Sequence, residues 1–172
     1  MNLWCSDRSA AEAKYGHISE WDTSAVTSLR ELFKDKVEFN DDISNWDVSN
    51  VTDMCGTFYN AKKFNKSLEK WDVSKVTDMR SMFNGASSFN HPLEKWDVSK
   101  VTNMSYMFQE ASSFNHQLEK WKVSKVTNMG WMFQGASSFN HPLEKWDVSK
   151  VEYKIDCFKN CPIAGSNKPK GF

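Results

Sequence analysis

Residues 96–120 read WDVSKVTNMSYMFQEASSFNHQLEK, and this 25-residue unit decides the fold because it recurs along the chain. The tryptophan that opens the unit returns every 25 residues, at Trp21, Trp46, Trp71, Trp96, Trp121 and Trp146. A phenylalanine follows each tryptophan twelve residues later, at Phe33, Phe58, Phe83, Phe108, Phe133 and Phe158. No insertion breaks the count, and so regular a period predicts a stack of similar units.

The apolar columns of the repeat form the predicted core. One unit is too short to bury a tryptophan, two phenylalanines and a leucine by itself, whereas stacked units can pack each column on its copy next door. The second phenylalanine column comprises Phe39, Phe64, Phe89, Phe114 and Phe139, and the aliphatic column comprises Ile43, Leu68, Leu93, Leu118 and Leu143. The end copies have one neighbour each and deviate, with Leu29 and Lys154 where the other copies carry methionine.

Two elements are expected within a unit. The alternation of apolar and polar residues at 96–98 favours a short strand. The spacing of Val101, Met104, Met107 and Phe108 favours a helical or 3-10 turn. We therefore predict a right-handed solenoid of leucine-rich-repeat type, with about six turns, parallel strands on one face and helical turns on the other.

The expected domain organisation follows the limits of the repeat. We predict an N-terminal cap at residues 1–16, a solenoid of about six repeats at 17–160 and a C-terminal tail at 161–172. The sequence contains no run of about 18 apolar residues, so no membrane span is expected. Residues 1–13 lack the basic start and apolar stretch of a signal peptide.

Charge bounds the partners. Lys plus Arg and Asp plus Glu both number 22, so the formal net charge is zero. Nucleic acid and anionic membranes both demand a basic excess, so neither is expected as the main partner.

The candidate binding residues flank the tryptophans, where a strand would point them outward. They are Lys70, Asp72, Lys95, Asp97, Lys120, Lys122, Lys145 and Asp147. One interpretation is a solvated face that neutralises itself, because glutamates precede these lysines and exposed pairs contribute little. The other is a polar ribbon that docks a protein or a glycan, since solenoids commonly bind on extended faces.

Acidic and histidine columns raise the question of metal. The aspartate column offers about one carboxylate per repeat and lies beside lysines, whereas calcium needs six to eight converging oxygens. A capping role, with Asp accepting from main-chain N–H groups, is preferred. The column of His91, His116 and His141 follows asparagines and precedes two prolines, which favours a turn over a metal site. No cofactor is expected.

Two further columns are polar. The asparagine column from Asn40 to Asn140 is expected to satisfy main-chain groups at a tight turn in every repeat. The threonine column of Thr52, Thr77, Thr102 and Thr127 suggests an ice-binding face, but the column is too narrow and too closely flanked by charged residues to favour one. The four cysteines do not recur with the repeat. They are interpreted as free thiols, with a Cys157–Cys161 bridge as the alternative.

The unit from Trp96 to Met104, followed by Met107-Phe108 and residues 111–115, resembles a known family. It is similar to the 25-residue repeats of BspA-like surface proteins and mycoplasma lipoproteins, an irregular branch of the leucine-rich repeats. The resemblance covers roughly residues 17–160. The segment 15–22 also resembles the first repeat of such proteins in marine algae. The resemblance implies an adhesin or surface-binding module at the cell surface or outside the cell, without shared catalytic residues.

The sequence carries no phosphate loop, nucleophile elbow or paired metal-ligand motif. Catalysis needs one asymmetric constellation, whereas a near-perfect repeat offers the same surface several times. We therefore expect a non-catalytic binding or scaffolding module for a protein, or for a glycan. The alternatives are a structural accessory subunit of a larger assembly, which an exposed apolar end would favour, and an ice- or mineral-binding array.

Overall fold

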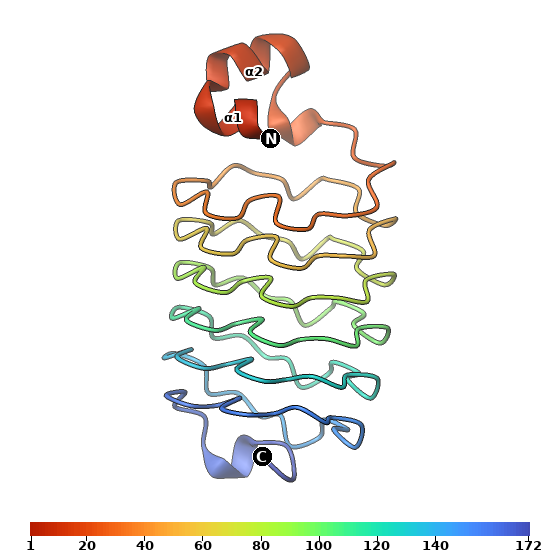
Figure 1. The fold of residues 1–172 in the computed structure, drawn as a ribbon, viewed down its shortest axis with the longest axis vertical. Coiled ribbons are helices and arrows are strands. Elements are labelled where there is room, and N and C mark those ends of the chain that lie inside the picture. Colours follow the sequence, from red (N-terminus) through yellow and green to blue (C-terminus); the bar gives the residue numbers. More distant parts are fainter.

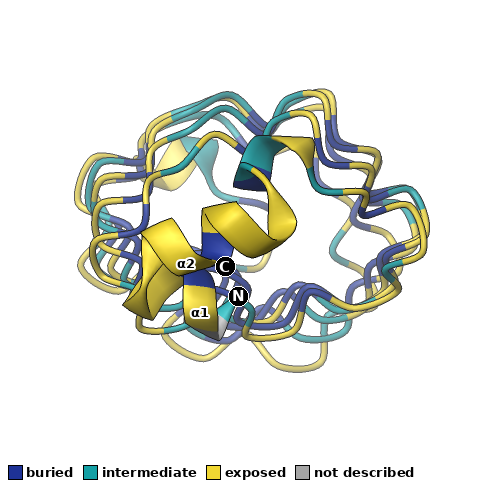
Figure 2. Cartoon of the chain, turned by 90° about the horizontal axis from the view of Figure 1, so that it is seen from above, coloured by how far each residue is buried: buried dark blue, intermediate teal, exposed yellow. Residues whose placement is uncertain are grey.

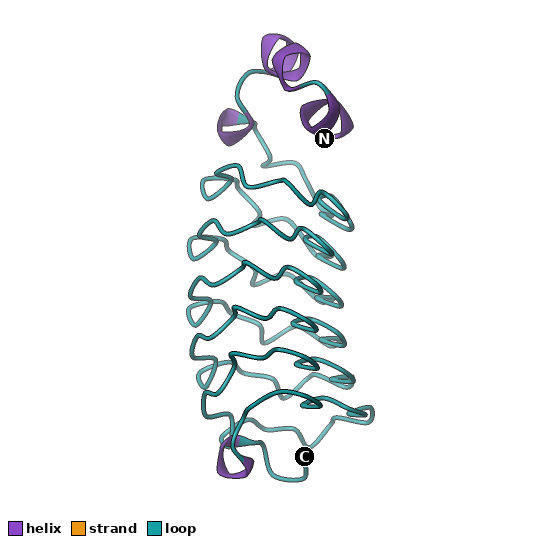
Figure 3. Ribbon diagram, turned by 90° about the vertical axis from the view of Figure 1, so that its left-hand side faces the viewer, coloured by secondary structure: helices purple, strands orange, loops and turns teal.

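The computed structural model describes residues 1–172, apart from the side chain of Asn2. Two α-helices, α1 (Asn2–Ser6) and α2 (Arg8–Tyr15), lie above a stack of coils, and the chain descends through the coils from one end to the other (Figure 1). Two short 3-10 helices flank the stack, η1 (Ile18–Glu20) before it and η2 (Gly165–Asn167) after it. Between them every coil is built from turns and loops (Figure 3).

The predicted strand-based solenoid of leucine-rich-repeat type is wrong. No strand is present in the part of the chain that the structure describes, and neighbouring coils share only single parallel bridges. The bridges join Ser28, Asp53, Asp78, Asn103, Asn128 and Tyr153 in succession. The expected strand at 96–98 is an open loop, because turns close on both sides of it: the N–H of Trp96 bonds the oxygen of Leu93, and that of Val101 bonds the oxygen of Val98.

A ribbon of turns takes the place of the predicted helical segment and also joins the coils. In the fourth coil the N–H groups of Met104, Tyr106, Phe108 and Glu110 donate to carbonyls of the next coil across 2.8–3.0 Å. Between them, Met107 and Gln109 donate three residues back within their own coil, and the N–H of Ser105 donates to the side-chain oxygen of Asn103. Tyr106 and Glu110 have φ values of +59° and +56°, and backbone in this left-handed region cannot continue a helix or a strand. We call residues 104–111 and their equivalents the turn segment.

Side chains join the coils on the other faces. From Trp46 onward, each tryptophan of the repeat donates its indole N–H to the main-chain oxygen 28 residues earlier, as Trp96 does to Leu68 across 3.0 Å. Each asparagine of the Asn40–Asn140 column accepts, through its side-chain oxygen, the main-chain N–H that follows it by 24 or 25 residues. The predicted role of the asparagine column is thereby confirmed.

The core lies inside the coils, as predicted from the apolar columns. Seen from above, the coils superimpose into a ring (Figure 2). The tryptophans from Trp46 to Trp146 and both phenylalanine columns up to Phe139 are buried, whereas the end members Trp21 and Phe158 are only partly so. Phenylalanine rings stack from coil to coil, with Phe83 and Phe108 5.6 Å apart and 7° from parallel.

Each end of the stack is covered by residues outside the repeat. At the N-terminal end Trp4 and Arg8 bond the carboxylate of Asp41, which fixes the helices to the first coil. At the C-terminal end the main-chain N–H of Ala164 continues the asparagine ladder by donating to Asn140, and Phe172 packs edge-on against Phe158. These contacts shield the first and last layers of the core from water.

Candidate functional site

The eight residues predicted to bind a ligand lie on the loops around the buried tryptophans. Lys95 pairs with Glu69 at 2.8 Å, and Lys145 pairs with Glu119 at 2.6 Å. Each hydrogen bond and charge raises the pKa of its lysine above the usual range. The side chains of Asp72, Asp97 and Asp147 accept the main-chain N–H two residues further on, at 3.0–3.1 Å. The structure therefore gives five of the eight residues a partner within the chain.

The aspartate column forms a turn in each of its coils. The hydroxyl and the main-chain N–H of Ser99 lower the pKa of Asp97, and Ser74 and Ser149 do the same to Asp72 and Asp147. A carboxylate that accepts these bonds is held in its charged form. This is the capping role predicted for the column. Lys122 interrupts the column and is exposed.

The histidine column forms main-chain hydrogen bonds. The Nε2 atoms of His91, His116 and His141 lie 3.1–3.2 Å from asparagine carbonyls of the preceding coil. Within the described residues, no three His, Cys, Asp or Glu side chains are grouped as a metal ion would need.

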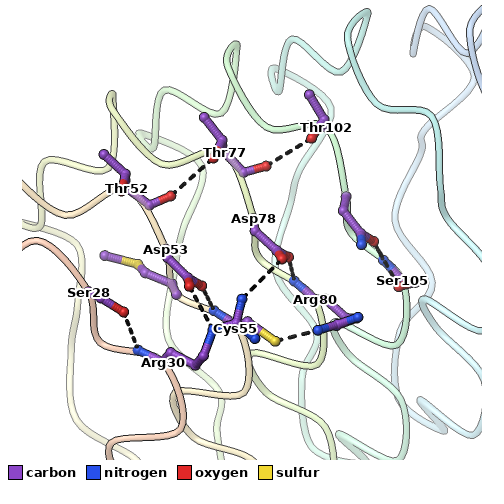
Figure 4. A network of polar contacts seen from close by, with 12 residues as sticks. Ser28, Arg30, Thr52, Asp53, Cys55, Thr77, Asp78, Arg80, Thr102 and Ser105 are labelled. Atoms are coloured by element: carbon purple, nitrogen blue, oxygen red, sulfur yellow. Dashed lines mark hydrogen bonds and ion pairs between the residues drawn. The ribbon is translucent and has the colours of Figure 1, made fainter.

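The threonine column is bonded in the same way, and its hydroxyls donate to the threonine carbonyl of the preceding coil (Figure 4). These hydroxyls donate within the chain, and lysines lie close to the column in the sequence.

The copies differ from one another on the turn segment. One column reads Arg30, Cys55, Arg80, Ser105, Gly130 and Ile155, and its neighbour reads Glu31, Gly56, Ser81, Tyr106, Trp131 and Asp156. We call these two columns the turn face. The tryptophan, phenylalanine and asparagine columns are kept from copy to copy, whereas the turn face and columns beside it vary, so the turn face is one of the places where this stack departs from its own repeat.

The first half of the turn face is a polar network (Figure 4). The Nε atom of Arg30 donates to Asp53 at 2.7 Å, and its guanidinium also lies 3.7 Å from Asp78. In the same column the Nε atom of Arg80 donates to the thiol of Cys55 at 3.4 Å. The arginines of this half therefore already have partners within the chain.

The second half of the turn face is aromatic. The rings of Tyr106 and Trp131 stack face to face, with centroids 4.8 Å apart and planes 5° from parallel, and both residues are partly exposed. Beside them an amide ladder runs from Asn84 through Gln109 to Gln134. The positive φ values of Tyr106 and Trp131, +59° and +57°, set these two side chains on the left-handed turn positions of the ribbon. The result is a pair of large rings that is partly open to solvent.

Sequence reasoning missed the turn face because it looked for columns that repeat. The signal that could have revealed it is a pair of neighbouring columns in which the residue changes from copy to copy. Tyr106 and Trp131 stand where earlier copies carry Ser81, Gly56 and Glu31.

The four cysteines are free thiols, as predicted, and the alternative Cys157–Cys161 bridge is absent from the described structure. Burial raises the pKa of Cys157 to about 12, so the thiol stays protonated and packs as an apolar group.

Comparison with known proteins gives the family. The chain belongs to the family described as "Mycoplasma protein of unknown function, DUF285", whose model matches residues 6–98 and 66–168. This confirms the mycoplasma part of the resemblance seen in the repeat. No curated protein and no solved structure matches the chain. Among the described residues, none of the helices is both long and apolar enough to pass through a bilayer.

Proposed function

We propose that this protein is a non-catalytic binding module that recognises a protein partner through the aromatic half of its turn face. The observation that carries the proposal is the stacked, partly exposed pair of Tyr106 and Trp131 on the face where the copies differ. Tryptophan and tyrosine are the residues most enriched at the energetic centres of protein interfaces. A surface that breaks a regular repeat can give one specific site, whereas a repeated column offers the same contact in every coil.

The two faces differ in what a partner would have to displace. On the lysine and aspartate face, Lys95, Lys145 and the aspartates would have to give up bonds within the chain. On the aromatic half, a partner would cover apolar rings that are already held parallel, so little side-chain entropy is lost on binding. The eight residues predicted from the sequence remain a prediction, and a direct comparison of the two faces decides between them.

We place the module at the cell surface, in line with the resemblance of its repeats to BspA-like surface proteins. Membership of the mycoplasma family supports the repeat type, and the surface location is part of the proposal. A glycan is the alternative ligand of the same face, since aromatic rings beside amide groups also suit sugars.

The test compares two sets of variants by co-purification from the native source and then by calorimetry with the purified partner. In the first set Tyr106→Ser and Trp131→Ser install the residue that Ser81 provides in the same column, at a φ of +55°. In the second, matched set Lys95→Asn, Lys120→Asn and Lys145→Asn install the residue that Asn45 provides in the lysine column. Both changes copy a residue that the stack already accommodates.

We expect the serine variants to lose at least tenfold in affinity and the asparagine variants to bind like the parent. The reverse pattern would move the site to the face predicted from the sequence. A parent protein that retains neither a protein partner nor a glycan from an array would contradict the proposed function.

A second candidate, the structural accessory role, is favoured by one observation. The large apolar side chains that are most exposed in the described chain lie at the two ends of the stack. Exposed apolar ends tend to pair with other surfaces.

A further inference from the structure

The most exposed large apolar side chains lie at the two ends of the stack. Leu3, Tyr15 and Val37 are 36, 53 and 39% exposed and lie in the helices or the first coil. Tyr153 and Ile155 are 63 and 58% exposed and lie in the sixth coil. No other large apolar residue of the described chain is exposed to this degree. Apolar surface gathered in this way marks a site of association.

The two end coils also carry opposite halves of a hydrogen-bond ladder. In the first to fifth coils, turn-segment N–H groups donate to the following coil, but those of Lys154, Asp156, Phe158 and Asn160 donate to nothing in the described structure. The carbonyls of Ser28, Arg30, Leu32 and Lys34 in the first coil likewise accept nothing there. The C-terminal edge therefore offers donors and the N-terminal edge offers acceptors, and open edges of this kind tend to find partners.

The ends differ in charge as well. Residues 1–25 hold four acidic and two basic side chains, whereas residues 151–172 hold four lysines and two acidic side chains. Residues 26–150 hold sixteen of each sign, so their net side-chain charge is zero. The side-chain charge is thus −2 at the N-terminal end and +2 at the C-terminal end.

A depression at the N-terminal end fits this charge. It is lined by Met1, Leu3, Tyr15, Glu20, Trp21 and Asp22, so it combines two carboxylates with aromatic rings. A lysine side chain suits such a place, because the ring faces and the carboxylates both attract a cation. The C-terminal tail presents the exposed Lys170, and beside it the partly exposed Lys168 holds its ammonium 5.5 Å from the ring of Phe158.

We propose that the C-terminal end of one copy of this chain docks on the N-terminal end of another copy. The inference deepens the accessory role proposed above and does not depend on the ligand of the turn face. Helices α1 and α2 lie above the first coil and the tail lies below the sixth (Figure 1), so the caps and the coil edges beside them form the contact. The two surfaces are different, so the contact is heterologous and each added copy leaves a free end for the next.

The first test is sedimentation velocity of the whole chain over a wide range of concentration and at low and high salt. We expect the mean mass to rise with concentration past that of a dimer and to fall as salt screens the charges. A protein that stays monomeric throughout would overturn the inference, and so would one that stops at a dimer.

Charge exchange tests the polarity of the contact. Lys168→Glu with Lys170→Glu reverses the C-terminal end, and Glu12→Lys with Glu20→Lys reverses the N-terminal end. Each double variant alone is expected to lose self-association, because its two ends then carry charge of one sign. Their mixture is expected to assemble again, with the two variants alternating, because every contact between unlike variants joins ends of opposite charge. Association of either variant with itself, or no pairing in the mixture, would contradict a head-to-tail contact.

Apolar variants supply a control for folding. Tyr153→Asn and Ile155→Ser install the residues of Asn128 and Ser105 from the same columns, so the coil is expected to fold. They should weaken self-association at least tenfold, whereas Tyr106→Ser, in the middle of the stack, should leave it unchanged. A matching loss from Tyr106→Ser would place the contact on the turn face and overturn the end-to-end arrangement.

Discussion

The indole N–H of Trp96 donates to the main-chain oxygen of Leu68 across 3.0 Å, at a point where both side chains are buried. The same bond links Trp46, Trp71, Trp121 and Trp146 to the coil that precedes each of them. The tryptophan column therefore fills the core and also adds a second hydrogen bond to a carbonyl that already accepts a turn N–H.

Replacing Trp96 by phenylalanine is expected to destabilise the stack. The change keeps an aromatic ring but removes the indole donor from the Leu68 carbonyl, which then accepts only the N–H of Trp71. The lost hydrogen bond and the smaller buried ring together cost about 1–3 kcal/mol. Chemical denaturation measures the loss. Trp21→Phe is the matched control, because Trp21 is only partly buried and bonds the oxygen of Gly16. Equal losses at the two positions would show that the buried bond adds nothing.

The asparagine ladder makes a smaller contribution. The side-chain oxygen of Asn90 accepts the N–H of Asn115 at 3.1 Å on an exposed face. Asn90→Ala should lower the free energy of unfolding by about 0.5–1.5 kcal/mol, the usual net value of one hydrogen bond. Asn90→Asp retains the acceptor and should lose less. A larger loss for aspartate than for alanine would argue against the acceptor role.

Acid should weaken the turns of the aspartate column. The pKa of Asp97 is lowered below its ordinary 3.8 in the fold, so its contribution is present above that value and is lost as the pH falls through the folded pKa. Asp97→Asn keeps the acceptor oxygen but cannot titrate. The stability advantage of the parent over this variant should therefore shrink as the pH falls below about 4. An advantage that is constant with pH would contradict the assignment.

Lys122→Asp should leave the fold intact. Lys122 is exposed, and an aspartate there can accept the N–H of Ser124 as the other members of the column do two residues on. The free energy of unfolding should change by no more than about 0.5 kcal/mol, as for most surface substitutions. An unfolded variant would mean that this column does not face solvent.

The core could be predicted because the apolar residues that form it recur every 25 residues. A tryptophan or phenylalanine every 25 residues has few ways to be buried except against its own copy, and Trp96 and Phe108 lie where the period places them. The asparagine ladder and the aspartate turns followed from the chemistry of the side chains.

The elements themselves could not be predicted from the pattern. Alternation at 96–98 is the same for a strand and for a loop between two turns, and the bonds from Trp96 and Val101 decide for the loop. The left-handed backbone at Tyr106 and Glu110 is marked by glycine only in other copies, at Gly56, Gly85 and Gly135, so in this unit the spacing of the apolar residues looked helical. The partly exposed pair of Tyr106 and Trp131 was not predicted, because the other copies carry no aromatic residue in this column.

Amide hydrogen exchange by NMR tests most directly the claim that the turn segments, and not the segments after the tryptophans, join the coils. The N–H of Tyr106 bonds Gly130 of the next coil at 2.9 Å, whereas the exposed Asp97 N–H bonds nothing in the described structure. We predict slow exchange at Met104, Tyr106 and Phe108 and fast exchange at Asp97. Slow exchange at Asp97 together with fast exchange at Tyr106 would restore a strand ladder and contradict the account.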